Sequence, residues 1–399
     1  MPNQFLSPEG DLENYFITEY WLIDQWVGDT LWTWGGNLGQ LGINLSGGTT
    51  TRSTPVTTFA GGSNWKQVAC SRVNSYTAAI KTDGTLWTWG RNSYGQIGDN
   101  TTTGRSTPVT TFAGGTNWKQ VICGGYGIAA IKTDGTLWTW GRNSYGQLGD
   151  NTTTNRSTPV TTFAGGTNWK QVSGGSRHAA AIKTDGTLWT WGQNSNGQSG
   201  DNTTTNRTTP VTTFSGGTNW KQVDCGTSFT AAIKTDGTLW TWGLNNLGQL
   251  GDNTSGSNRL TPVTTFSGGT NWKQVACGSL YTAAIKTDGT LWACGNNGAS
   301  QLGDNTTTSR STPVTTFAGG TNWKQVASGT QDHAAAIKTD GTLWVWANNY
   351  NARLGINDQT IRRTPVTTFA GGTNWKQVAG GNNFTAAITS GTDPTFFIS

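Results

Sequence analysis

The feature that most restricts the fold of this chain is a short motif that recurs along almost its whole length. One copy, AAIKTDGTLWTWG at residues 129–141, has two runs of β-forming residues on either side of Asp134-Gly135. An Asp-Gly pair is typical of a tight hairpin turn, because glycine tolerates positive φ and aspartate favours turns. We therefore predict a β-hairpin with strands at 129–132 and 136–140. Closely similar copies lie at 78–90, 180–192, 231–243, 283–295 and 335–347.

The spacing of the copies indicates the architecture. The first tryptophan of the returning strand recurs at intervals of 51 to 55 residues, at Trp32, Trp87, Trp138, Trp189, Trp240, Trp292 and Trp344. A period near 50 residues is typical of a propeller or a solenoid. Each period contains four strand-like runs, which in the third copy lie at 118–123, 128–133, 136–140 and 159–163, and none shows helical periodicity. The sequence predicts an all-β, closed seven-bladed β-propeller with four-stranded blades.

The two ends of the array supply complementary parts of one blade. Residues 30–35 and 55–59 match the last two strands of a repeat, whereas 375–378 and 385–389 match the first two. A blade shared between both ends would seal the seam of a ring, whereas a linear solenoid caps its ends. We expect the WKQV-type strand to lie innermost, followed by AAIK, LWTW and PVTTF, and we assign residues 29–399 to the propeller.

Residues 1–28 match nothing else in the chain and are predicted to form a docking segment. Residues 1–29 hold six acidic residues and no lysine or arginine, and 15–27 is apolar and aromatic. Such a segment would bind an assembly partner or pack on its own propeller. With no basic leader and no apolar run of 18 residues, we expect neither a signal peptide nor a membrane span, and a virion or cytoplasmic location.

The repeats resemble those of the regulator of chromosome condensation family. The pattern WGRNxxGQLGDN, TPV, WKQVxCG and AAIKTDGTLW runs through residues 30–399 and carries that family's WG-x-N and GQLG signatures. The resemblance implies the propeller fold but no single function, because similar propellers act as exchange factors for a small GTPase, chromatin binders, light sensors and a β-lactamase inhibitor. Bacterial and viral proteins of unknown role also contain such repeats. One departure is that the position before the AAIK-like strand, often histidine in the family, holds Tyr76, Gly127, His178, Phe229, Tyr281, His333 and Phe384.

Residues that could carry catalysis are few. The two histidines, His178 and His333, lie three repeats apart, and six aspartates, one in each AAIKTDG copy, precede a glycine as turn residues. No C-x-x-C pair, P-loop or nucleophile-elbow motif occurs. We therefore predict that the chain is not an enzyme and uses no cofactor or metal. Aspartates after the GQLG-like turns and arginines before the Thr-Pro pairs would form ion pairs; an anion-binding ring of arginines is the alternative.

Variation among these near-identical copies points to one face of the ring. It concentrates in the loop before the AAIK strand and in the loop after LWTWG, and both loops lie at the open end of the hairpin. Loops can drift where nothing constrains them, but the long NTTTNRST loop differs little between copies. Tyrosine, arginine and histidine suit a contact surface. The candidate partner-binding residues are Arg72, Asn74, Tyr76, Arg91, Tyr94, Tyr126, Arg142, Tyr145, Arg177, His178, Phe229, Leu247, Tyr281, Asp332, His333 and Phe384.

From these observations we predict a non-enzymatic interaction or attachment protein that binds a protein or glycan through the diversified face. The combination of a private terminal segment and a repetitive head resembles virion appendages, for instance of bacteriophages, so a structural virion protein is one hypothesis. The alternative is a regulatory or inhibitory propeller that binds a soluble enzyme or a small GTPase. Nucleic acid is not expected as a partner.

Overall fold

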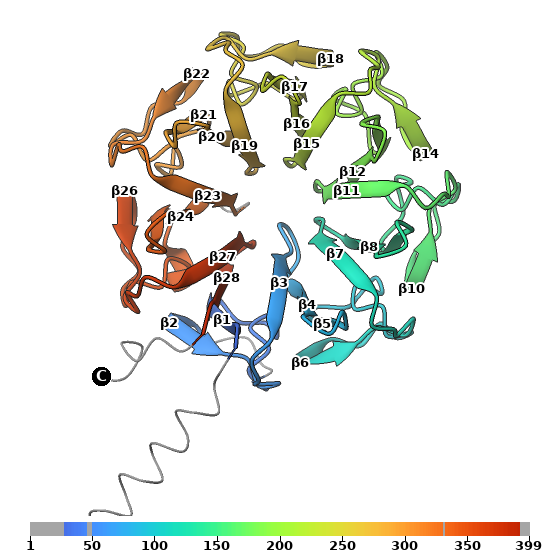
Figure 1. Cartoon of the computed structure of the whole chain (residues 1–399), viewed down its shortest axis with the longest axis vertical. Helices are drawn as coiled ribbons and strands as arrows, with labels where there is room; N and C mark the ends of the chain where they lie inside the picture. The colour runs from blue at the N-terminus through green and yellow to red at the C-terminus, as the bar shows by residue number, and fades with distance from the viewer. Residues whose placement is uncertain (1–27, 46–49, 330–331, 392–399) are drawn as a thin grey trace, which may run out of the picture.

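The computed structural model describes residues 28–45, 50–329 and 332–391 of the chain. These residues form seven four-stranded antiparallel sheets, which stand around a central axis like the blades of a propeller (Figure 1). Within them no helix is long and apolar enough to cross a membrane. The prediction of an all-β seven-bladed propeller is confirmed.

We letter the blades A to G around the ring and give each from its innermost to its outermost strand. Blade A is β27 (Trp375–Gly380), β28 (Phe384–Thr389), β1 (Thr30–Gly35) and β2 (Arg52–Thr57); blade B is β3 (Trp65–Cys70), β4 (Tyr76–Lys81), β5 (Leu86–Gly90) and β6 (Arg105–Thr110); blade C is β7 (Trp118–Cys123), β8 (Gly127–Lys132), β9 (Leu137–Gly141) and β10 (Arg156–Thr161); blade D is β11 (Trp169–Gly174), β12 (His178–Lys183), β13 (Leu188–Gly192) and β14 (Arg207–Thr212). Blade E is β15 (Trp220–Cys225), β16 (Phe229–Lys234), β17 (Leu239–Gly243) and β18 (Arg259–Thr264); blade F is β19 (Trp272–Cys277), β20 (Tyr281–Lys286), β21 (Leu291–Gly295) and β22 (Arg310–Thr315); blade G is β23 (Trp323–Ser328), β24 (His333–Lys338), β25 (Leu343–Ala347), a short 3-10 helix η1 (Tyr350–Ala352) and β26 (Arg362–Thr367).

Blade A closes the ring as expected. Strand β1 pairs with β28 in unbroken antiparallel register from Thr30 opposite Thr389 to Gly35 opposite Phe384. The two ends of the described chain are therefore joined by a complete strand pairing rather than by side-chain packing alone, and neither β1 nor β28 is left as an open sheet edge.

The outermost strand begins earlier than the sequence indicated. In blade C it starts at Arg156, which lies opposite Gly141, and the register shifts between Arg156 and Val160. Pro159 lies within this irregular stretch, where its missing N–H is tolerated because an outer strand has no further neighbour. The predicted run 159–163 thus captured only the second half of the strand.

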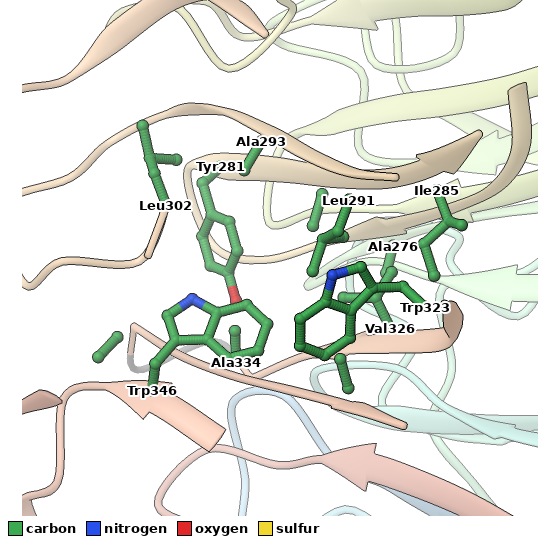
Figure 2. Close-up of a cluster of buried hydrophobic side chains, with 13 residues drawn as sticks. Ala276, Tyr281, Ile285, Leu291, Ala293, Leu302, Trp323, Val326, Ala334 and Trp346 are labelled. Carbon is green, nitrogen blue, oxygen red and sulfur yellow. The ribbon is translucent and has the colours of Figure 1, made fainter. Parts of the chain in front are cut away.

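The core consists of clusters of apolar side chains between neighbouring blades. Figure 2 shows the cluster between blades F and G, where the ring of Tyr281 is directed toward Trp346 and Leu291 lies close to Trp323. In blade C, Leu137 packs toward blade D, whereas Trp138 and Trp140 pack toward blade B. Both faces of each sheet are covered by neighbours, which explains why the LWTW strand is apolar on both sides.

A ring of glutamines links the inner strands of the blades. Gln67 donates from Nε2 to the carbonyl of Val121 in the next blade and accepts from its N–H, at 3.0 Å each. The same paired bonds recur at Gln120, Gln171, Gln222, Gln274, Gln325 and Gln377. Because Gln377 binds Val68, the ring crosses the seam between the two chain ends. Each glutamine thus satisfies backbone groups that the inner strand would otherwise leave unpaired.

The hairpin turns have the geometry that the Asp-Gly pair requires. Gly135 has φ of +81°, and a Cβ at this position would lie 2.0 Å from the carbonyl oxygen of Thr167 in the next blade. Asp134 accepts hydrogen bonds at Oδ1 from the backbone and hydroxyl of Thr136. A glycine is therefore needed both for the backbone conformation and for the contact between blades.

Candidate functional site

The two faces of the ring differ in composition. We call variable face the side that carries the loops between the first and second and between the third and fourth strands of each blade, and uniform face the side with the TDG turns and the AGGTNW segments. The arginines lie in variable-face loops or at the adjoining starts of the outermost strands, while the thirteen lysines lie at the uniform-face ends of the first and second strands. The two kinds of cation are thus segregated.

Five predicted site residues come together on the variable face of blades B, C and D, and we call this group the Tyr–Arg patch: Tyr94, Tyr126, Arg142, Tyr145 and Arg177. The guanidinium carbon of Arg142 lies 4.9 Å from the ring centroid of Tyr94 and 5.0 Å from that of Tyr126. That of Arg177 lies 5.1 Å from the Tyr145 centroid and 5.7 Å from the Tyr126 centroid.

The rings of the patch support one another. Tyr94 and Tyr126 make an edge contact with centroids 6.1 Å apart, and all five side chains are half-buried. Stacking on an aromatic ring fixes a guanidinium in place while its N–H groups remain able to bind a further acceptor. The patch is therefore an ordered surface and not a set of independent side chains.

The arginines of the patch differ from those at the rim in their partners. Six rim arginines form ion pairs of 2.6–3.5 Å with aspartates of the preceding loop, namely Arg105–Asp99, Arg156–Asp150, Arg207–Asp201, Arg259–Asp252, Arg310–Asp304 and Arg362–Asp358. These pairs confirm the predicted contact between loop and outer strand. Within the described part of the chain, Arg142, Arg177 and the neighbouring exposed Arg91 pair with no carboxylate. The patch thus presents uncompensated positive charge.

A small cavity of about 30 Å³ lies beside the patch between blades C and D, lined by Tyr126, Gly127, Arg177 and His178 among others. We call the position before the AAIK-like strand the slot. Blade C has Gly127 in the slot, whereas the other blades have tyrosine, phenylalanine or histidine. The missing side chain accounts for this space. A cavity of this size can hold a single water molecule but no organic ligand.

The six candidate partner-binding residues at the start of a second strand are buried, so the expectation that they lie at a surface is wrong. Tyr76, Phe229, Tyr281, His333 and Phe384 are fully buried and His178 is 2% exposed. Each begins the second strand of its blade. From there the hydroxyl of Tyr76 donates to the carbonyls of Gly124 and Gly127 in blade C, at 2.7 and 2.9 Å. The variable slot therefore fills the interface between blades.

The two histidines share this structural role. Nε2 of His178 lies 3.1 Å from the hydroxyl of Thr230, and Nε2 of His333 lies 3.1 Å from that of Thr385. Burial, assisted by the positive charge of Arg72, lowers the pKa of His178 to about 3, and burial beside Arg353 lowers the pKa of His333 well below its usual range. Both rings are neutral at physiological pH. Among the described residues no three His, Cys, Asp or Glu side chains are grouped to hold a metal ion.

The remaining candidates lie in different surroundings. Arg72 extends into the central channel, a cavity of about 230 Å³ that the inner strands line, and Asn74 is buried and donates to the carbonyl of Gly125 at 3.2 Å. Leu247 and Asp332 are half-buried on the variable face of blades E and G, away from the Tyr–Arg patch. The structure thus joins five of the sixteen candidates in one surface, with Arg91 beside them, and separates the other ten.

Comparison with known proteins agrees with this architecture. The family described as RCC1-like domain matches residues 30–329 and 116–395. The ultraviolet-B receptor UVR8 of Arabidopsis thaliana is 30% identical over 346 residues, which cover 85% of this chain and 77% of the receptor. The structure of yeast RCC1 (Prp20) bound to Kap60 superposes with a TM-score of 0.79 at 18% identity, covering 99% of this chain and 96% of that one. A second structure of Prp20p, from Saccharomyces cerevisiae, gives a TM-score of 0.78 at 18% identity and covers 93% of each chain. This chain belongs to the RCC1-like domain family.

Proposed function

We propose that this protein is a non-enzymatic binding module that contacts a partner protein through the Tyr–Arg patch. The observation that carries the proposal is the contrast between the rim arginines, each held by an aspartate, and Arg142 and Arg177, which rest on tyrosine rings without a carboxylate. A guanidinium held in this way binds carboxylate or phosphate groups with two N–H groups at once. The partner surface would accordingly be acidic.

The composition of the patch supports a protein rather than a neutral glycan. Tyrosine and arginine dominate the residues that carry most of the binding energy at protein interfaces, because they combine a large apolar area with polar groups. Three tyrosines and two arginines lie within stacking distance here. An interface centred on them would have an aromatic middle and a charged edge.

The relatives favour a regulatory role over attachment to a virion. Prp20p of Saccharomyces cerevisiae has binding properties toward Gsp1p and histones, and yeast RCC1 forms a complex with Kap60. We propose by analogy that this chain regulates a soluble protein. These relatives are eukaryotic proteins and lend no support to a virion appendage.

The proposal is tested by site-specific photo-crosslinking. A photoreactive phenylalanine analogue at position 145 should yield a discrete adduct in lysate of the source cells, and the adduct should disappear in the Arg142→Gln/Arg177→Gln double variant. The same analogue at Ala299, the equivalent position of blade F, is the matched control and should yield no such adduct. Loss of the adduct at high salt would agree with ion pairing. An adduct of equal intensity from both positions, or one insensitive to the arginine variant, would contradict the proposal.

A further inference from the structure

The uniform face carries a set of repeated side chains that the proposed function does not use. It consists of the thirteen lysines, which lie at the second position of each WKQV strand and after AAI in blades B to G: Lys66, Lys81, Lys119, Lys132, Lys170, Lys183, Lys221, Lys234, Lys273, Lys286, Lys324, Lys338 and Lys376. A surface that gathers this much charge of one sign attracts a partner of the opposite charge.

The charge of this face is positive and partly fixed in position. In each of blades B to G one lysine lies over two tryptophan rings, as Lys132 does over Trp118 and Trp138 at 4.8 and 4.6 Å. The other lysine of each blade is exposed. The face also carries six exposed aspartates of the TDG turns, so the lysines outnumber them by about two to one. A partner for this face therefore needs acidic groups.

The described chain begins on this face. The carbonyl of Asp29 accepts a hydrogen bond of 3.0 Å from the N–H of Trp65, and its carboxylate forms an ion pair with Lys376. A Cβ at Gly28 would lie 2.5 Å from the side chain of Ser63. The chain that precedes Gly28 therefore starts between blades A and B, beside Lys66 and Lys376.

We propose that residues 1–27 of this chain dock on its own uniform face. These residues, which lie outside the described part, contain five acidic residues, no lysine or arginine, and a run of aromatic and aliphatic residues at 15–27. Their carboxylates complement the lysines of this face. An acidic segment tethered beside a basic surface acts at a high effective concentration, so weak contacts suffice.

The geometry allows this docking and disfavours a second copy as the occupant. Twenty-seven residues can span about 90 Å when extended, whereas a four-stranded blade is about 15–20 Å wide. The segment is therefore long enough to cross several blades. A second copy would bring an identical set of thirteen lysines against the first, and like charges repel.

The test uses the full chain at low concentration. A zero-length carbodiimide reagent, which joins a carboxylate to a lysine only in direct contact, should link residues 9–24 to Lys66 or Lys119 within one molecule. Peptide mass spectrometry of the monomer band identifies the links. Crosslinks found only between molecules would overturn self-docking, and so would the absence of any link.

A second measurement compares Lys66 with Lys221. Both are exposed and lie in the same NWKQV sequence, and neither has an ion pair in the described part of the chain, so they are matched in reactivity toward acetic anhydride. Lys66 should react about twofold to fivefold more slowly than Lys221 on the far side of the ring, the range that an exposed ion pair gives. The difference should vanish in the variant Glu9→Gln/Asp11→Asn/Glu13→Gln/Glu19→Gln/Asp24→Asn. Equal rates in the unaltered chain would overturn the proposal.

Discussion

Arg72 of blade B reaches across the central channel and forms an ion pair with Asp224 of blade E, its Nη2 lying 3.0 Å from both carboxylate oxygens. The same guanidinium donates from Nη1 to the carbonyls of Cys225 and of Cys277, the latter at 2.9 Å. Asp224 also accepts from the hydroxyl of Ser173 and the N–H of Cys277, at 2.7 Å each. Four blades, B, D, E and F, are thereby joined at the axis.

We predict that Arg72→Met destabilises the ring by about 2–3 kcal/mol, because it leaves the largely buried carboxylate of Asp224 without its cation. The value stays below that of a fully buried pair because both side chains are 15% exposed. Urea unfolding measures the loss. The Arg72→Met/Asp224→Asn double variant should recover most of it, and equal losses in Arg72→Met and the double variant would contradict the view that the unpaired carboxylate causes the loss.

The glutamine ring predicts that Gln377 adds to the strand pairing and apolar packing that close the ring between blades A and B. Gln377→Ala removes the paired bonds to the backbone of Val68, where blade A meets blade B. We expect a loss of about 1–3 kcal/mol, since both Val68 groups lose their partners. Hydrogen exchange at the Val68 amide should accelerate. Gln222→Ala, which affects the interface between blades E and F, is the matched control. It should accelerate hydrogen exchange at the Val275 amide without accelerating exchange in β1 and β28.

Because the slot residues are buried, we predict that their substitution lowers the stability of the ring rather than its affinity for a partner. Phe229→Ala removes a fully buried ring from the cluster between blades E and F and should cost about 3–5 kcal/mol. Tyr145→Ala, which removes a half-buried ring of the Tyr–Arg patch, should lower the unfolding midpoint far less. Thermal unfolding followed by circular dichroism compares the two variants. Similar midpoints would contradict the assignment of the slot to the core.

The sequence could predict the ring because its signals repeat. Turn residues and strand lengths recur with the period of the repeat, and the split blade indicates a closed ring. The strand order follows from which strand has the smallest side chains. The hairpin predicted at 129–141 appears in the structure as β8 and β9, where β8 begins two residues before the predicted strand and β9 is displaced by one residue at each end. The Arg–Asp pairs of the rim were predictable for the same reason, since both partners recur at a fixed distance.

The burial of the slot was not predictable from the same pattern. Tyr76, His178 and Phe229 vary between copies as surface residues do, yet each fills a gap against a different neighbouring blade. Variation in a core position arises here because each interface between blades can be repacked separately. The contact between Arg72 and Asp224 was equally hidden, because a repeat period carries no information on single residues that meet across the axis.

The buried histidines predict a loss of stability in mild acid. His178 and His333 stay neutral in the folded ring, so the unfolded chain binds more protons below the ordinary histidine pKa of about 6.5. Stability is therefore fully present above that pH and should fall below it, by up to about 1.4 kcal/mol per pH unit for each histidine. The aspartates whose pKa is lowered contribute only near and below about pH 4, and burial raises the pKa of Asp332, which acts in the opposite direction. A fall in stability between about pH 6.5 and 4.5 is therefore assigned to the histidines. The His178→Phe/His333→Phe variant copies the slot residue of blades E and A. In urea unfolding it should show a smaller decrease of the unfolding free energy per pH unit. Phe229→His should steepen it by one further histidine, and a slope that neither variant changes would show that other groups govern the acid response.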